Sequence, residues 1–270
     1  MKILLTNDDG YEAKGIKALY SRLLHIGEVL VSAPLSEQSS TGHGITHSSP
    51  LKIKRFACKN NYSGIAVDGK PADCVKVALG AEWPSIYGND SLPDLVVSGI
   101  NIGANVGIHT FYSGTVAAAR EAAFMGCPAI SFSLYIGNEE TPNWKHISNL
   151  ALNITNVLFK SGIQPGELLN VNIPASAGIN ESFPEIHFVP MSKSPLRNKY
   201  EKRTSPYGKE YFWSAGGGMD FFKKRKKEDV SLIQKGNIVI TPLSFDLTNY
   251  ERMEWWEQAS QNNFCINNQE

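Results

Sequence analysis

The chain has 270 residues, of which 42% are hydrophobic and 19% are charged. This length suits one large α/β domain with an extension, or two domains, and the composition is typical of a packed globular protein rather than a disordered one. Lys and Arg number 26, as do Asp and Glu, so the formal net charge is zero and argues against a general polyanion binder or a nucleic-acid partner.

Short apolar runs alternate with helical patterns up to about residue 180. We expect strands at 2–6, 28–33, 51–56, 64–68, 95–97, 129–134 and 168–173, with 51–56 and 64–68 paired as a hairpin across Asn60-Asn61. Apolar residues at helical spacing predict helices at 15–26, 71–82, 114–126 and 145–160. This alternation predicts an α/β domain at 1–180, with a mostly parallel sheet and helices on both faces.

The alternation ends beyond residue 180. Antiparallel strands are expected at 185–191 and 199–213, a further strand at 237–243 and a final helix at 249–260. We interpret 181–270 as a β-rich extension rather than an independent enzyme. Trp255-Trp256 is either an exposed anchor for another subunit or part of a core.

Three polar loops follow the first, second and third core strands of the predicted sheet. They are Asn7-Asp8-Asp9-Gly10, Ser36 to Gly44, and Ser98 to Gly107. In open parallel sheets, ligands bind beyond the carboxyl ends of the strands. Segments far apart in the sequence are therefore expected to meet at one edge.

Asp8 and Asp9 are the most informative pair of residues at this edge. Adjacent carboxylates repel each other, and a bound cation relieves that repulsion. Mg²⁺ and Mn²⁺ take oxygen ligands, and Ser39, Asn101 and Asn105 in the neighbouring loops can complete such a shell. The alternative is that the two acids cap the following helix or form a turn with Gly10.

Ser113-Gly114-Thr115 opens the Ala-rich helical pattern, where free backbone N–H groups suit a phosphate. The alternative, which is favoured for this segment in isolation, is an ordinary Ser N-cap. The glycines at 99–107 match neither the dinucleotide nor the P-loop pattern, and no G-x-S-x-G motif is present.

Other polar residues favour structural interpretations. His43, His47 and His109 can serve in acid–base chemistry, but each is interpreted as a solvated loop side chain. The basic run at 223–227 is likewise interpreted as a solvated loop.

Cysteine spacing and hydropathy predict a soluble, cytoplasmic protein without a membrane partner. The four cysteines form neither a C-x-x-C pair nor a zinc-finger cluster, so we expect reduced thiols. No apolar stretch is long enough to cross a bilayer, and the apolar run at the N-terminus is too short for a signal peptide.

Several spaced motifs together resemble the SurE family, in the family's order and through nearly the whole chain. They are Asn7-Asp8-Asp9-Gly10, Ala33-Pro34 with Gln38-Ser39, Gly69 to Val75, Pro93 to Asn101, Tyr112 to Ala117, Leu169 to Pro174, Ile240 to Leu243, and Asp246-Leu247-Thr248. One stretch departs from the pattern, because Gly107-Ile108-His109-Thr110 stands where many members have acidic residues. That difference bears on base or sugar preference.

The resemblance implies a Rossmann-like fold and a divalent-metal-dependent 5′-nucleotidase with one Mg²⁺ or Mn²⁺ per subunit, acting on nucleoside 5′-monophosphates. It implies that the metal ligands are Asp8, Asp9, Ser39 and Asn101, of which Asp8 and Asp9 are also catalytic. It places Asn105, Ser113, Gly114 and Thr115 near the phosphate. It further implies a homodimer or homotetramer in which C-terminal arms embrace a partner subunit.

Two other functions are considered beside this one. A receiver domain also has paired acids after its first strand, but it needs an acceptor Asp at the end of a later strand, where this chain has Val97-Ser98-Gly99. The second alternative is a nucleotide-binding protein without catalysis. Release of phosphate from nucleotides would exclude it.

Overall fold

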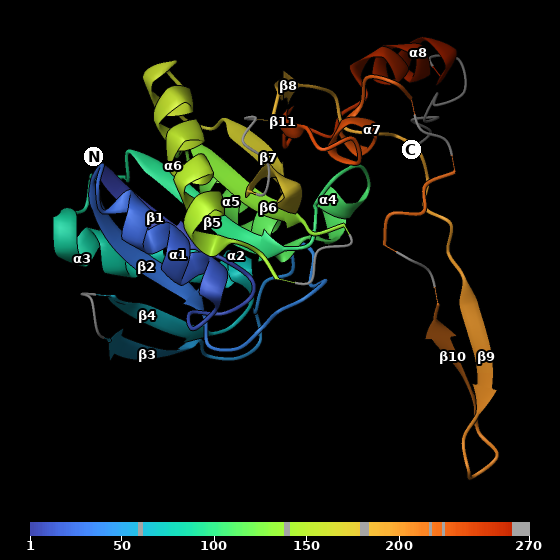
Figure 1. The fold of residues 1–270 in the computed structure, drawn as a ribbon, viewed down its shortest axis with the longest axis horizontal. Coiled ribbons are helices and arrows are strands. Elements are labelled where there is room, and N and C mark those ends of the chain that lie inside the picture. The colour runs from blue at the N-terminus through green and yellow to red at the C-terminus, as the bar shows by residue number, and fades with distance from the viewer. Residues whose placement is uncertain (59–61, 138–140, 179–183, 216–217, 223–224, 261–270) are drawn as a thin grey trace, which may run out of the picture.

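The structure is a computed structural model that describes residues 1–270 except 59–61, 138–140, 179–183, 216–217, 223–224 and 261–270 (Figure 1). Its centre is a nine-stranded sheet. In spatial order the strands are β3 (Lys52–Ala57), β4 (Ser63–Asp68), β2 (Glu28–Pro34), β1 (Lys2–Thr6), β5 (Leu95–Ile102), β6 (Ala129–Tyr135), β7 (Leu168–Pro174), β11 (Ile238–Leu243) and β8 (Ile186–Phe188).

Parallel pairing dominates this sheet, as the sequence predicts. It links β4, β2, β1, β5, β6 and β7, whereas β3 pairs antiparallel with β4, and β11 pairs antiparallel with β7. The predicted hairpin is thus confirmed, although its Asn60-Asn61 turn lies outside the described residues. The mostly parallel α/β fold class is confirmed.

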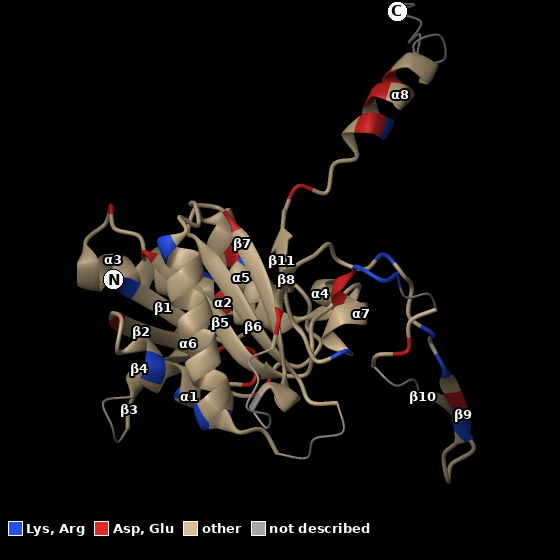
Figure 2. Ribbon diagram, turned by 45° about the horizontal axis from the view of Figure 1, so that its top comes forward, with Lys and Arg blue, Asp and Glu red and all other residues tan. Residues whose placement is uncertain are grey.

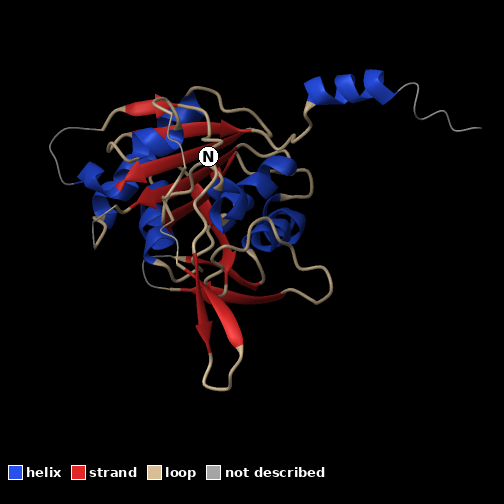
Figure 3. Ribbon diagram, turned by 90° about the vertical axis from the view of Figure 1, so that its right-hand side faces the viewer, coloured by secondary structure: helices blue, strands red, loops and turns tan. Residues whose placement is uncertain are grey.

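Helices cover both faces of the sheet (Figure 3). On one face lie α1 (Lys14–Leu23) and α6 (Trp144–Lys160), and on the other lie α2 (Pro71–Val77) and α5 (Gly114–Phe124). The shorter segments are η2 (Ala78–Glu82), α3 (Trp83–Tyr87), α4 (His109–Tyr112), η3 (Ala175–Gly178) and α7 (Asp229–Ile233). The helix expected at 71–82 is α-helical only to Val77 and continues as a π-helix, because Pro84 has no N–H with which to extend an α-helical ladder.

Burial on both faces explains why the central strands read as continuous apolar runs. Successive side chains of a strand point to opposite faces, so Ile3 and Leu5 pack in the core under α1 and α6, while Leu4 packs in the core under α5. All three are fully buried. The sheet and its helices therefore form a rigid support for the loops at the strand ends.

The C-terminal region differs from the sequence prediction in two respects. The segment expected as an antiparallel strand at 185–191 is the short edge strand β8, which pairs in parallel with β11. The segment expected as one strand at 199–213 is a hairpin of β9 (Tyr200–Thr204) and β10 (Glu210–Ser214), because Pro206 and Gly208 form a turn between them.

This hairpin and the final helix α8 (Tyr250–Ser260) project from the body of the molecule (Figures 1 and 2). None of the residues of α8 is buried within the chain. Across the described residues, no helix has both the length and the apolar character that a membrane crossing requires.

Candidate functional site

The loop after β1 turns sharply and places two acidic residues at the edge of the sheet. Asn7 Nδ2 donates a hydrogen bond to the Gly10 carbonyl at 2.9 Å, and Gly10 has φ 97°, which glycine adopts readily. The sequence N-D-D-G thus forms a local turn. Asp8 is only 6% exposed, and Asp9 is half-buried.

The ionised forms of Asp8 and Asp9 are destabilised in this position. Burial raises the pKa of Asp8, and hydrogen bonds from the Thr115 hydroxyl and backbone oppose that rise. Burial, followed by the charges of Asp8 and Glu37, raises the pKa of Asp9 to about 7. A cation bound between the carboxylates would favour the ionised form of both.

Asp8 lines a cavity of about 380 Å³ that brings together most of the predicted site residues. It is lined by Asp8, Ser39, Ser40, Asn101, Ile102, Asn105, His109, Tyr112, Ser113 and Leu196. Asp9, Gly114 and Thr115 lie outside this lining. Loops after β1, β2 and β5 therefore meet the start of α5, as expected for the carboxyl edge of a parallel sheet.

The oxygen donors in the cavity suit a hard divalent cation. Asn101 lies near the end of strand β5 rather than in a loop, and its Nδ2 donates to the Gly103 carbonyl at 2.7 Å, which fixes the orientation of the amide. Ser39 supplies a hydroxyl and Asp8 a carboxylate. Carboxylate, hydroxyl and amide oxygens are the ligands that Mg²⁺ and Mn²⁺ prefer, so this donor set favours them over softer ions.

Glu37 is a functional candidate that sequence reasoning missed. The Ser39 hydroxyl donates to Glu37 Oε1 at 2.6 Å, and the Glu37 charge raises the pKa of both Asp8 and Asp9. The available signal was an acid two residues before Ser39 in the same loop. Its carboxylate adds a third negative charge to the edge where the cation is expected.

The start of α5 contacts Asp8 directly. The Ser113 hydroxyl accepts a hydrogen bond from the Val116 N–H at 3.1 Å, so it is the N-cap of α5. A Cβ atom on Gly114 would lie 2.7 Å from the Asp8 Cβ, so only glycine permits this approach. The Thr115 hydroxyl donates to Asp8 Oδ1. The side chains of Ser113 and Thr115 thus serve the local structure, while Ser113 also lines the cavity.

Two histidines are not the solvated loop side chains that the sequence suggested. His109 lines the cavity, its ring lies 5.4 Å from that of Phe221, and burial lowers its pKa. His43 lies away from the cavity lining, where its Nε2 is 2.7 Å from Glu121 Oε2. His47 is exposed, as predicted.

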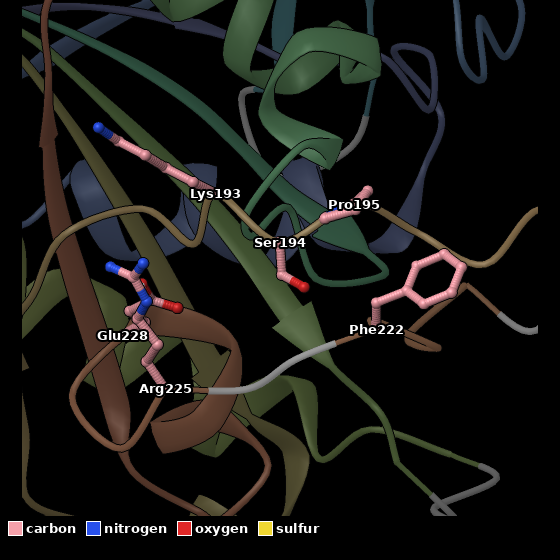
Figure 4. Close-up of a pocket in the computed structure, with 6 residues that line it drawn as sticks. All are labelled: Lys193, Ser194, Pro195, Phe222, Arg225 and Glu228. Carbon is pink, nitrogen blue, oxygen red and sulfur yellow. The ribbon is translucent and has the colours of Figure 1, made fainter.

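A second cavity, of about 350 Å³, is lined by Lys193, Ser194, Pro195, Phe222, Arg225 and Glu228 (Figure 4). Arg225 Nε lies 3.8 Å from Glu228 Oε1, and Figure 4 shows the Lys193 side chain pointing away from Arg225. Part of the basic run at 223–227 falls outside the described residues. The paired Arg225 does not favour this cavity as an anion site.

Comparison with known proteins gives a consistent result. The family model "Survival protein SurE" matches residues 3–198. The chain is 40% identical over 248 residues to "5'-nucleotidase SurE" of Rhodopirellula baltica, covering 92% of this chain and 94% of that protein. It is 38% identical over 257 residues to the protein of the same name from Syntrophobacter fumaroxidans, covering 94% and 97%. The crystal structure of the SurE protein from Aquifex aeolicus superposes with a TM-score of 0.80 at 34% identity, covering 96% of this chain and 100% of that one.

Proposed function

Since this chain belongs to the SurE family, we propose that it is a metal-dependent 5′-nucleotidase that hydrolyses nucleoside 5′-monophosphates to nucleoside and phosphate. The observation that carries this proposal is the pair Asp8 and Asp9 beside a cavity that holds further oxygen donors. We assign the metal ligands as Asp8, Asp9, Ser39 and Asn101, with one Mg²⁺ or Mn²⁺ per subunit. The oxygen donors of the cavity support this choice.

The bound metal would neutralise charge on the phosphoryl oxygens and orient the ester. Asn105 would hold a remaining phosphoryl oxygen through its side-chain amide, and the start of α5 would hold others through the Ser113 hydroxyl and the Gly114 backbone N–H. Thr115 holds the Asp8 carboxylate by its hydrogen bond. Water adds to phosphorus, the bond to the 5′ oxygen breaks, and that oxygen takes up a proton as the nucleoside leaves.

A panel of phosphomonoesters tests this function. The purified protein is incubated with nucleoside 5′-monophosphates, sugar phosphates and an aryl phosphate, each with Mg²⁺, Mn²⁺ or chelator, and released phosphate is measured. We expect nucleotides to be preferred and chelator to abolish release. Nucleotide binding without any phosphate release would instead identify a non-catalytic nucleotide-binding protein.

We also propose that the protein forms a homodimer or homotetramer through residues 181–270. Support comes from the hairpin and α8, whose large apolar side chains are exposed within one chain, including Trp213 at 61% and Trp256 at 60%. A two-stranded hairpin is marginally stable alone, and it gains stability when its faces are covered. We place the protein in the cytoplasm, which the free thiols of Cys58, Cys74 and Cys127 support.

A further inference from the structure

Asn105 is held by side chains from two strands of the sheet. Its backbone N–H donates to Asn172 Oδ1 at 2.7 Å. Its backbone carbonyl accepts from Asn170 Nδ2 at 2.8 Å and from Asn172 Nδ2 at 3.1 Å. Its side-chain Nδ2 donates a hydrogen bond to Ser133 Oγ at 2.8 Å. Both backbone polar groups of this one loop residue are therefore satisfied by side chains rather than by other backbone groups.

The residues that hold Asn105 are fully buried and lie side by side. Asn170 and Asn172 are two apart on β7, so they share one face of the strand, and Ser133 on β6 is the register partner of Asn172. The Ser131 hydroxyl donates to Asn170 Oδ1 at 2.9 Å and so fixes the Asn170 amide. We call Asn170, Asn172 and Ser133 the Asn105 bracket.

Buried amides in a sheet core require an explanation. Apolar residues would fill these positions without the desolvation that a buried amide suffers, and each amide is tolerated because its oxygen and its nitrogen are both hydrogen-bonded. The bonds within the bracket converge on one residue, and that residue lines the cavity. The bracket thus fixes one side chain relative to the sheet.

The bracket leaves the Asn105 side chain with unused hydrogen-bonding capacity. One Nδ2 hydrogen is taken by Ser133, and within the described part of the chain no group donates to Asn105 Oδ1. The second Nδ2 hydrogen and Oδ1 remain to meet a ligand. Because the backbone of Asn105 cannot shift without breaking bonds to Asn170 and Asn172, that contact is placed in advance.

We infer that Asn170, Asn172 and Ser133 are positioning residues that hold Asn105 for contact with the phosphoryl group. This inference rests on the proposed function, and it adds that part of the site's geometry is set by polar side chains on β6 and β7. Prearranged contacts lower the reorganisation needed in the transition state, and a displacement of about 1 Å can reduce the rate by roughly 100-fold.

A double-mutant cycle on Asn172→Ala and Asn105→Ala tests the inference. We expect Asn172→Ala alone to lower kcat/KM for a nucleoside 5′-monophosphate by roughly 10- to 100-fold. In the Asn105→Ala background the same change should have an effect of about twofold or less, because the side chain that it positions is already gone. Equal fold-losses in both backgrounds would overturn the inference.

Stability controls separate positioning from loss of folding. Thr155 is fully buried on α6, so Thr155→Ala leaves a cavity and should lower Tm while leaving kcat/KM unchanged. If Asn172→Ala does not fold, Ser133→Ala replaces it in the cycle, since it removes only the side-chain partner of Asn105. A loss of kcat/KM for Ser133→Ala that persists when Asn105 is Ala would also overturn the inference.

The same experiments distinguish failure of the inference from failure of the proposed function. A wild-type protein that releases phosphate, with additive losses in the cycle, contradicts only the bracket. A wild-type protein that releases no phosphate contradicts the proposed function. In that case the cycle is measured on binding of inorganic phosphate by calorimetry, where coupled losses of affinity support the bracket and additive losses overturn it.

Discussion

The Thr115 hydroxyl donates a hydrogen bond to Asp8 Oδ1, and this bond joins the first turn of α5 to the loop after β1. Both side chains are buried, Thr115 fully and Asp8 to all but 6%. A buried carboxylate that loses a donor is destabilised in its charged form. Thr115 therefore helps to keep Asp8 ionised and oriented toward the cavity.

Replacing Thr115 tests this relationship. Thr115→Val keeps the shape of the side chain and removes the donor. The free energy of the folded state or of the transition state should rise by about 1–3 kcal/mol. We expect kcat/KM to fall by roughly 5- to 150-fold, since 1.4 kcal/mol corresponds to a factor of ten. Thr115→Ser restores the hydroxyl and should recover most of the activity. Wild-type activity in Thr115→Val would show that the bond has no functional role.

Gly114 offers a steric test of the contact between α5 and Asp8. A Cβ at this position would lie 2.7 Å from the Asp8 Cβ and 2.9 Å from the Pro71 Cγ, so Gly114→Ala must displace one of them. We expect activity to fall by more than about 10-fold, with a loss of stability of about 1–3 kcal/mol, as for other overpacked sites. The matched control is Gly80→Ala, because a Cβ there meets nothing within 4 Å. Equal behaviour of the two variants in assay and thermal melt would contradict the prediction.

The sequence predicted the sheet well because its signals are local. Buried runs such as Leu95-Val96-Val97 and the polar turn Asn7 to Gly10 carry their structure in a few adjacent residues. The convergence of Asp8, Ser39 and Asn101 also followed, because parallel strands end at one edge of a sheet.

The sequence alone does not predict the contacts between residues that lie far apart in the chain. The pairing of Thr115 with Asp8, and that of Asn172 with Asn105, joins residues 107 and 67 positions apart. In a single sequence, Asn170 and Asn172 look like ordinary strand residues. The parallel orientation of β8 was missed for a similar reason, since a three-residue strand carries no periodic signal that gives its direction.

His109 provides a pH-dependent prediction. Burial lowers its pKa below the ordinary value of about 6.5, and the Ala104 carbonyl opposes this in part. As pH falls below 6.5, the unfolded chain takes up the proton before the folded chain does, so stability is lost until pH passes the folded pKa. Between pH 8 and pH 5.5, we expect Tm to fall further in the wild type than in His109→Asn. His47→Asn, at an exposed position, should match the wild type. A wild-type Tm that falls no further than that of His109→Asn would contradict the assigned burial.

Removal of the divalent ion should lower stability through Asp8 and Asp9. A ligand present at 100 times its Kd stabilises the folded state by about 2.7 kcal/mol, so Mg²⁺ or Mn²⁺ should raise Tm and chelator should reverse the effect. Because the pKa of Asp9 is raised to about 7, the ion must displace a proton at low pH, and the increase in Tm should be larger at pH 8 than at pH 6. An Asp8→Asn/Asp9→Asn variant that keeps the full increase would place the ion elsewhere.

Oligomer formation should depend on the exposed aromatic residues of the hairpin. Trp213 on β10 lies across from Glu201 on β9, and Tyr211 lies across from Arg203, so both aromatics share one face of the hairpin. We expect the double change Trp213→Ser/Tyr211→Ser to reduce the molecular mass in sedimentation, because it removes apolar area that only another chain can cover. Tyr207, 90% exposed in the turn, is the matched control, and Tyr207→Ser should leave the mass unchanged. If the double variant keeps the wild-type mass, the hairpin face is not an interface, and the same measurement on Trp255→Ser/Trp256→Ser then tests α8 by itself.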